Sequence, residues 1–183
     1  VVAGIEECKK GFFEAADAIG AKADKLWPDD DRGLAIRLLA GYLQQYHDRF
    51  ADEAFDAMGP STEIDLGPKY GIGAFVERQG DVVVFLAEGK RVTFTRDEFN
   101  LIDGLRFRLT QRYFDAGQKP ANNLIVGALH YVKNVDQDGR YHADSKIGRE
   151  LAATRWKTAQ SSMDERVAEH ATALLKLPGT DWD

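Results

Sequence analysis

The sequence predicts a single α+β domain, with an N-terminal αα-hairpin, a central three-stranded antiparallel meander and C-terminal helices. Its 183 residues fall in the single-domain range. Apolar residues recur every three to four positions in residues 5–58, as in helices that face a core. Residues 71–95 instead contain short β-type runs parted by glycine turns. Helical spacing returns in residues 96–115 and 145–177.

The helical hairpin is predicted from two long amphipathic segments. The first covers residues 5–26 and ends at Trp27-Pro28. Three aspartates at 29–31 then offer N-cap oxygens and favourable charge to a second helix, which is predicted to run to Met58 before Gly59-Pro60. The short connection between them predicts an antiparallel pair.

The meander and the helix after it are predicted from turn and capping chemistry. Residues 61–70 read as a loop, and turns at Gln79-Gly80 and Glu88-Gly89 separate three strands at 72–77, 81–87 and 91–94. Thr95 and Glu98 form a capping box, with Phe94 and Phe99 placed as a hydrophobic staple. These four residues predict one helix from residue 96 to about 115.

The last third of the chain is predicted to be helical. Residues 120–135 fit either a buried strand or a buried helix, and we favour the helix. Ser162 and Glu165 form a second capping box, which predicts that the final helical region breaks near Ser161.

The stretch 81–105 resembles the opening of the winged-helix domains of OmpR-type response regulators. The residues that carry the resemblance are a strand, a Gly-Lys turn, a strand and then Thr95-Arg96-Asp97-Glu98-Phe99-Asn100-Leu101-Ile102. The resemblance covers about 25 residues and implies a nucleic-acid-binding regulator. Those domains continue with a basic recognition helix and a wing, and residues 119–140 contain neither pattern plainly.

Composition and charge limit the classes of function. The net charge is −6, and residues 1–60 hold 7 Lys and Arg against 12 Asp and Glu. Duplex-binding domains normally carry a basic surplus. No apolar run approaches the roughly 20 residues of a membrane span. Cys8 is the single cysteine, so we expect no internal disulfide and a cytoplasmic location.

Two charged faces are candidate binding sites. Asp48, Asp52 and Asp56 lie four residues apart, so a regular helix would present them together, either as a docking strip for a basic partner or as a solvated face. Arg108 and Arg112 likewise share a helix face beside Tyr113, which suits phosphates or single-stranded bases, or a solvated surface. A later basic cluster comprises Lys146, Arg149, Arg155, Trp156 and Lys157.

One segment partly matches a calcium-binding loop. Asn134, Asp136, Asp138 and Gly139 occupy the first, third, fifth and sixth positions of an EF-hand loop, but Ser145 replaces the bidentate glutamate at the twelfth. The sequence therefore predicts an ordinary turn here and no metal site.

The sequence contains no recognisable catalytic motif. Cys8 lies on the apolar stripe of the first helix, and His47, His130, His142 and His170 lack metal-ligand spacing. We therefore expect no cofactor and a non-enzymatic protein-binding or adaptor domain with a protein partner. A nucleic-acid-binding regulator is the first alternative, and an enzyme with a dispersed site is the second, because catalytic residues need be adjacent only in space.

Overall fold

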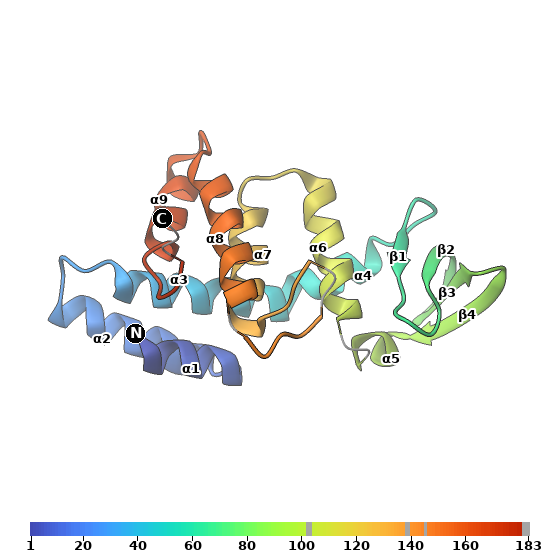
Figure 1. The fold of residues 1–183 in the computed structure, drawn as a ribbon, viewed down its shortest axis with the longest axis horizontal. Coiled ribbons are helices and arrows are strands. Elements are labelled where there is room, and N and C mark those ends of the chain that lie inside the picture. Colours follow the sequence, from blue (N-terminus) through green and yellow to red (C-terminus); the bar gives the residue numbers. More distant parts are fainter. Residues whose placement is uncertain (102–103, 138–139, 145, 181–183) are drawn as a thin grey trace.

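The computed structural model describes residues 1–101, 104–137, 140–144 and 146–180. The molecule is elongated, with packed helices at one end and a small sheet at the other (Figure 1). It has the predicted α+β order of N-terminal helices, a central antiparallel sheet and C-terminal helices. Among the described residues, no helix is both long and apolar enough to cross a membrane.

The first predicted helix is two helices, α1 (Val2–Lys10) and α2 (Phe13–Leu26). Gly11 takes a left-handed φ of 83°, and its amide and that of Phe12 bond back to the carbonyls of Cys8 and Glu7. This is a glycine C-cap, which ends a helix because glycine meets no Cβ penalty at positive φ. The prediction of one continuous helix was therefore wrong at Gly11.

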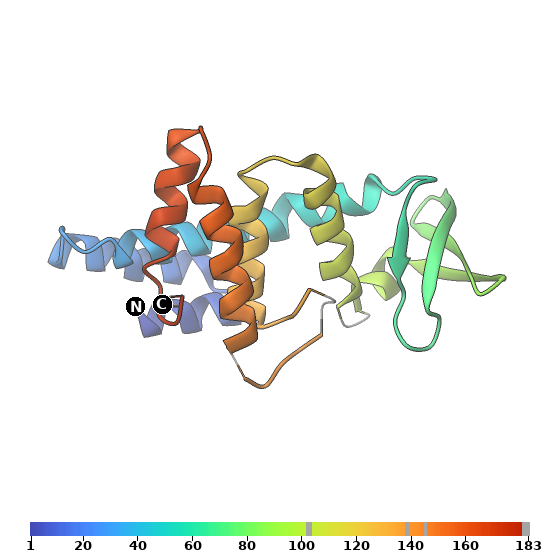
Figure 2. The ribbon, with the colours of Figure 1, turned by 45° about the horizontal axis from the view of Figure 1, so that its top comes forward.

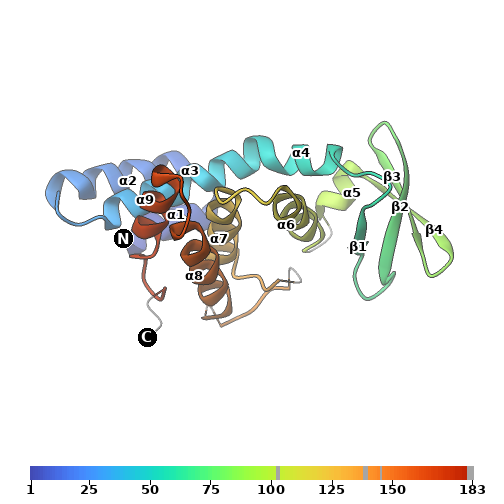
Figure 3. The same ribbon diagram turned by 90° about the horizontal axis from the view of Figure 1, so that it is seen from above.

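The second predicted helix keeps its direction but changes its geometry. It comprises α3 (Arg32–Gln45), a π turn η1 (Tyr46–Phe50) and α4 (Ala51–Asp56). α2 lies along α3 as the predicted hairpin (Figure 3). Their backbones approach closely at two glycines, because a Cβ on Gly20 would lie 2.7 Å from the carbonyl oxygen of Gly33. A larger residue at Gly20 would push the two helices apart.

The sheet has four antiparallel strands in the order β1-β2-β3-β4, one more than predicted. The strands are β1 (Glu63–Asp65), β2 (Ile72–Gln79), β3 (Val82–Ala87) and β4 (Lys90–Thr95). The additional strand β1 lies in the segment that was predicted to be a loop. Its three residues bury only Ile64, which is too little for a periodic signal.

The capping box is confirmed, but the helix that it starts is short. Thr95 Oγ1 accepts the amide of Glu98 at 3.1 Å, and the Glu98 carboxylate accepts the amide of Thr95 at 2.9 Å. The helix α5 (Arg96–Leu101) is followed by Gly104 at a φ of 73°, and α6 (Leu105–Gly117) then takes a new direction. The prediction of a single helix over 96–115 was therefore wrong.

The C-terminal helices are α7 (Asn122–Lys133), α8 (Lys146–Gln160) and α9 (Glu165–Leu174). They confirm the helix in 120–135 and the break near Ser161. The cap of α9 differs from the prediction, because Asp164 rather than Ser162 accepts the first free amides, those of Arg166 and Val167.

Two apolar clusters hold the molecule together. The helices pack around Trp156, which is fully buried and donates its indole N–H to the carbonyl of Leu124 at 3.3 Å. The sheet packs against α4, α5 and α6 around Phe85 and Phe99. Tyr113 on α6 contacts both clusters. The continuous run of α3, η1 and α4 joins the two ends (Figure 2).

Candidate functional site

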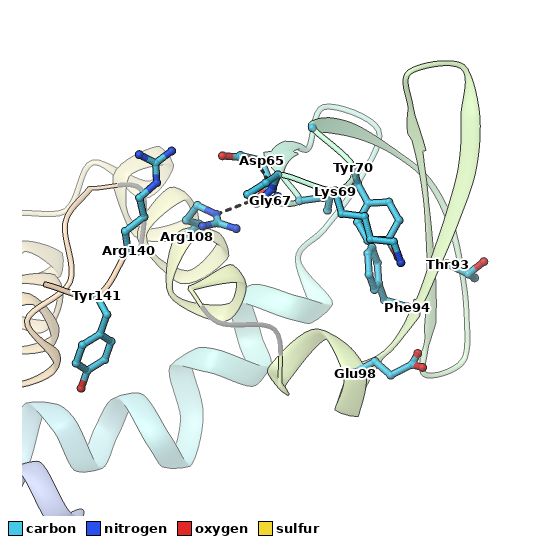
Figure 4. A pocket seen from close by; sticks show the side chains of 13 residues that line it. Asp65, Gly67, Lys69, Tyr70, Thr93, Phe94, Glu98, Arg108, Arg140 and Tyr141 are labelled. Carbon is cyan, nitrogen blue, oxygen red and sulfur yellow. Dashed lines mark hydrogen bonds between the residues drawn. The ribbon is translucent and has the colours of Figure 1, made fainter.

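A cleft of about 1120 Å³ lies between the sheet and the helical end of the molecule (Figure 4). The described residues that line it come from the end of β1 with the β1–β2 loop, the end of β4 with α5, Arg108 on α6, and the segment 140–141. The cleft is therefore built by residues that lie up to 76 positions apart, since Asp65 and Tyr141 both line it.

Three cationic side chains line the cleft, and each comes from a different segment. They are Lys69 in the β1–β2 loop, Arg108 on α6 and Arg140. The Lys69 ammonium lies 4.7 Å from the centre of the Tyr70 ring, within range of a cation–π interaction. The Arg140 backbone is fixed because its amide donates to the Asp136 carboxylate at 2.8 Å. Among the described residues, the wall therefore carries three cations against the carboxylates of Asp65 and Glu98.

Aromatic rings supply the apolar part of the wall. The rings of Tyr70 and Phe94 meet edge to face at a centroid distance of 5.6 Å, which ties the β1–β2 loop to β4. Phe94 is buried in the sheet core, whereas Tyr141 is 64% exposed at the opposite side of the cleft. Tyrosines in such positions offer an apolar face and a hydrogen-bonding hydroxyl to the same ligand.

Two carboxylates among the described wall residues accept hydrogen bonds from backbone groups of the chain. Asp65 accepts the amide of Gly67 at 2.8 Å. Glu98 accepts the amide and the hydroxyl of Thr95 at 2.9 and 3.1 Å, and these hydrogen bonds lower the pKa of Glu98 below its usual value. Both carboxylates therefore stabilise the walls of the cleft.

Arg108 and Arg112, predicted as a basic face, clamp the outer edge of β1. Arg108 Nε donates to the carbonyl of Asp65 at 3.0 Å, while Arg112 donates to those of Glu63 and, at 2.9 Å, Ser61. Carbonyls of alternate strand residues point from the same edge about 7 Å apart. Residues four apart on a helix rise by about 6 Å, so the two guanidinium groups match that spacing.

The predicted acidic face is divided by the π turn. A π turn closes with i→i+5 hydrogen bonds, so residues four apart across it do not stack. Asp48 accepts a hydrogen bond from Gln44, whereas Asp52 and Asp56 both pair with Arg96, at 3.2 and 2.7 Å. Asp56 also pairs with Arg78 on β2 at 2.7 Å. Asp52 and Asp56 thus join α4 to the sheet, and their binding of a partner stays a prediction.

The calcium-like segment has its first ligand position occupied by structural hydrogen bonds. Asn134 donates to the carbonyls of His142 and Asp144 and accepts the amide of Gly148. Asp136 accepts from His142 Nε2 at 2.8 Å. Asp138 and Gly139 lie outside the described residues. Across the residues that the structure describes, no three His, Cys, Asp or Glu side chains are grouped to hold a metal ion.

The later basic cluster does not form one surface. Trp156 is in the core, and Arg155 pairs with Asp115 on α6 through both guanidinium nitrogens, at 2.5 and 3.0 Å. An aromatic ring interleaved with these cations is therefore not available to stack on a base.

Cys8 and the four histidines lie outside the cleft wall. Burial raises the pKa of the Cys8 thiol to about 12, so the thiolate is not formed near neutral pH. His130 is fully buried, hydrogen-bonds through Nδ1 to the carbonyl of Val135 at 2.9 Å, and has its pKa lowered to about 4, chiefly by burial. His170 Nδ1 lies 2.7 Å from the Tyr42 hydroxyl on another face of the molecule.

Comparisons of the chain with protein-family models, with curated proteins and with solved structures gave no match. Of the five residues predicted as binding residues, the structure places only Arg108 in the cleft. Sequence reasoning missed Lys69, Tyr70, Arg140 and Tyr141. The visible signal for Lys69 and Tyr70 was the Gly67-Pro68 turn, which indicates a loop but not what the loop faces. Arg140 and Tyr141 follow the turn predicted at Asp136 and Asp138, which likewise does not reveal what they face.

Proposed function

We propose that this chain is a non-enzymatic protein-binding module that holds an extended, acidic segment of a partner protein in the cleft. The observation that carries the proposal is that Lys69, Arg108 and Arg140, from three separate segments, line one cleft. Complementary charge of this kind selects an anionic partner and accelerates its association.

The size and composition of the cleft favour a polypeptide segment. Its volume of about 1120 Å³ exceeds the usual range of small-molecule pockets, about 300–1000 Å³. The Tyr70 and Tyr141 rings suit the mixed polar and apolar contacts of a peptide. The described carboxylates in the wall, Asp65 and Glu98, are engaged by backbone amides, which favours binding over acid–base chemistry.

Single-stranded nucleic acid is the second candidate, because cations and exposed tyrosines also hold phosphates and stacked bases. The carboxylates of Asp65 and Glu98 in the wall and the net charge of −6 repel a phosphate backbone, which is charged at every nucleotide, more than a peptide, which is charged only at its Asp and Glu residues. We therefore favour the protein partner.

A selection from a displayed library of random ten-residue peptides tests the proposal. We expect enrichment of peptides rich in Asp and Glu, with binding measured afterwards by fluorescence anisotropy. The double variant Lys69→Gln, Arg140→Gln should lose about tenfold in affinity or more, equivalent to about 1.4 kcal/mol. The matched control, Lys22→Gln with Lys157→Gln, removes two exposed cations outside the cleft and should bind as wild type.

Two results would contradict the proposal. Equal affinity of the cleft variant and the control would show that the cleft is not the site. Tighter binding of a ten-residue oligothymidine than of any selected peptide would move the assignment to nucleic acid. Binding of acidic peptides should also weaken with added salt, because the charges lie at an open surface.

A further inference from the structure

The two edges of the sheet differ in what covers them. At β1, the outward carbonyls of Ser61, Glu63 and Asp65 receive the guanidinium groups of α6. At β4, the hairpin register sets which groups point outward. β3 and β4 pair as Ala87 with Lys90 and Val83 with Phe94, and the amide of Arg96 donates to the carbonyl of Asp81.

In this register Lys90, Val92 and Phe94 exchange hydrogen bonds with β3, since such pairs alternate along an antiparallel ladder. The amides and carbonyls of Arg91 and Thr93 therefore point away from the sheet. No hydrogen bond joins those groups to any other residue that the structure describes. The next outward amide, that of Thr95, is taken by Glu98. An uncovered edge of this kind is a template for another strand.

The cleft reaches this edge. Thr93 and Phe94 line it together with the β1–β2 loop, and the Tyr70 ring rests against Phe94. Figure 4 places Thr93 on the outer side of the strand, beyond Tyr70 and above Glu98. A segment held by the cleft can therefore continue along β4 in an extended conformation.

We propose that β4 receives the acidic segment as a fifth strand of the sheet, a mode that rests on the proposed function and specifies it. Main-chain hydrogen bonds from an added strand supply affinity with little demand on sequence. The charge of β4 favours this occupant, because the strand carries Lys90 and no carboxylate, although its Arg91 pairs with Glu77 on β2.

A second copy of the chain is a poorer occupant for the same reason. Its β4 carries no carboxylate that could lie opposite Lys90. Opposite charges across a strand pair stabilise it. An acidic strand supplies a carboxylate at that position.

Two substitutions at Thr93 test the pairing. Thr93→Pro removes the outward amide, and proline is tolerated on an edge strand where that amide faces solvent. Thr93→Val keeps the amide and serves as the control. With the tightest acidic peptide from the selection above, we expect Thr93→Pro to bind about tenfold more weakly and Thr93→Val to bind as wild type. Melting curves of both variants check the fold.

Amide hydrogen exchange gives a second readout on the wild-type protein. Saturation with the same peptide should slow exchange at Arg91 and Thr93 by about tenfold or more, while Val92, already paired with β3, serves as the reference. This measurement decides the matter if Thr93→Pro fails to fold.

Each contrary result has a distinct meaning. Unchanged binding by Thr93→Pro and unchanged exchange at Arg91 and Thr93, with the Lys69 and Arg140 variant still impaired, would overturn strand addition and leave the proposed function standing. Slowed exchange without peptide, accompanied by dimer mass in sedimentation, would make a second copy the occupant and overturn the acidic strand. If selection yields no acidic peptide, both proposals fall.

Discussion

The clamp of α6 on β1 gives the most direct test of how the sheet is held. Arg112→Met removes two charge-assisted hydrogen bonds, those to the carbonyls of Ser61 and Glu63, and keeps most of the aliphatic stem. A hydrogen bond from a charged group contributes about 1.5–3 kcal/mol when water is excluded. Arg112 is exposed, so water replaces much of the loss, and we expect a cost of about 1 kcal/mol.

The partly buried Arg108 should show a larger effect than Arg112. Its bond to the carbonyl of Asp65 is partly shielded from water, so Arg108→Met should cost about 1–2 kcal/mol. Loss of either arginine should also loosen β1 locally, which would expose the amide of Phe75 that now donates to Thr62 at 2.8 Å. Lys119→Met, at an exposed cation beyond α6, is the control.

Urea denaturation followed by circular dichroism measures the global effect, and hydrogen exchange at Phe75 measures the local one. If both arginine variants match Lys119→Met in unfolding free energy and in exchange at Phe75, the two arginines do not stabilise β1, and the proposed role of their hydrogen bonds is refuted.

Three further predictions concern stability. Thr95→Ala should cost about 1 kcal/mol in denaturant unfolding, because the Glu98 amide loses its acceptor, and a change of zero would refute the cap. Asp52→Asn with Asp56→Asn should lower stability by about 1 kcal/mol at low salt and less at high salt, since Arg96 keeps only Asp81 and Arg78 loses Asp56. A rise in stability would mean that carboxylate repulsion dominates. Burial lowers the pKa of His130 from its usual 6.5 to about 4, so between these pH values the unfolded chain binds the proton and the folded chain does not. The free energy of unfolding should therefore fall by about 3 kcal/mol as the pH drops from 6.5 to 4. His130→Phe should flatten that dependence in pH-resolved unfolding.

The sequence predicted those elements whose causes are local. The capping box at Thr95, the glycine turns of the meander and the helix in 120–135 depend on neighbours within a few residues. The helix breaks at Gly11 and Gly104 were missed, because periodicity continues across them and a glycine inside a helical pattern does not reveal its φ. The strand β1 was missed because its support is distant: Arg112 lies 51 positions from Ser61.

The candidate site was less predictable than the fold for the same physical reason. Asp52 and Asp56 were recognised as a charged face, but Arg96, 44 and 40 positions away, pairs with both. The cleft unites Lys69 and Arg140 across 71 positions, and no spacing rule connects a loop to a segment that far along the chain. Charge sign and residue type are visible in a sequence, whereas convergence on one cleft requires the tertiary structure.

Mapping of chemical shifts on isotope-labelled protein tests the central claim, that the cleft is the binding site. On addition of an acidic ten-residue peptide from the selection, we predict the largest amide shifts at Lys69, Tyr70, Thr93, Arg140 and Tyr141, the residues that the fold brings together there. Shifts confined to the helical end of the molecule, with the cleft unchanged at saturation, would contradict the claim.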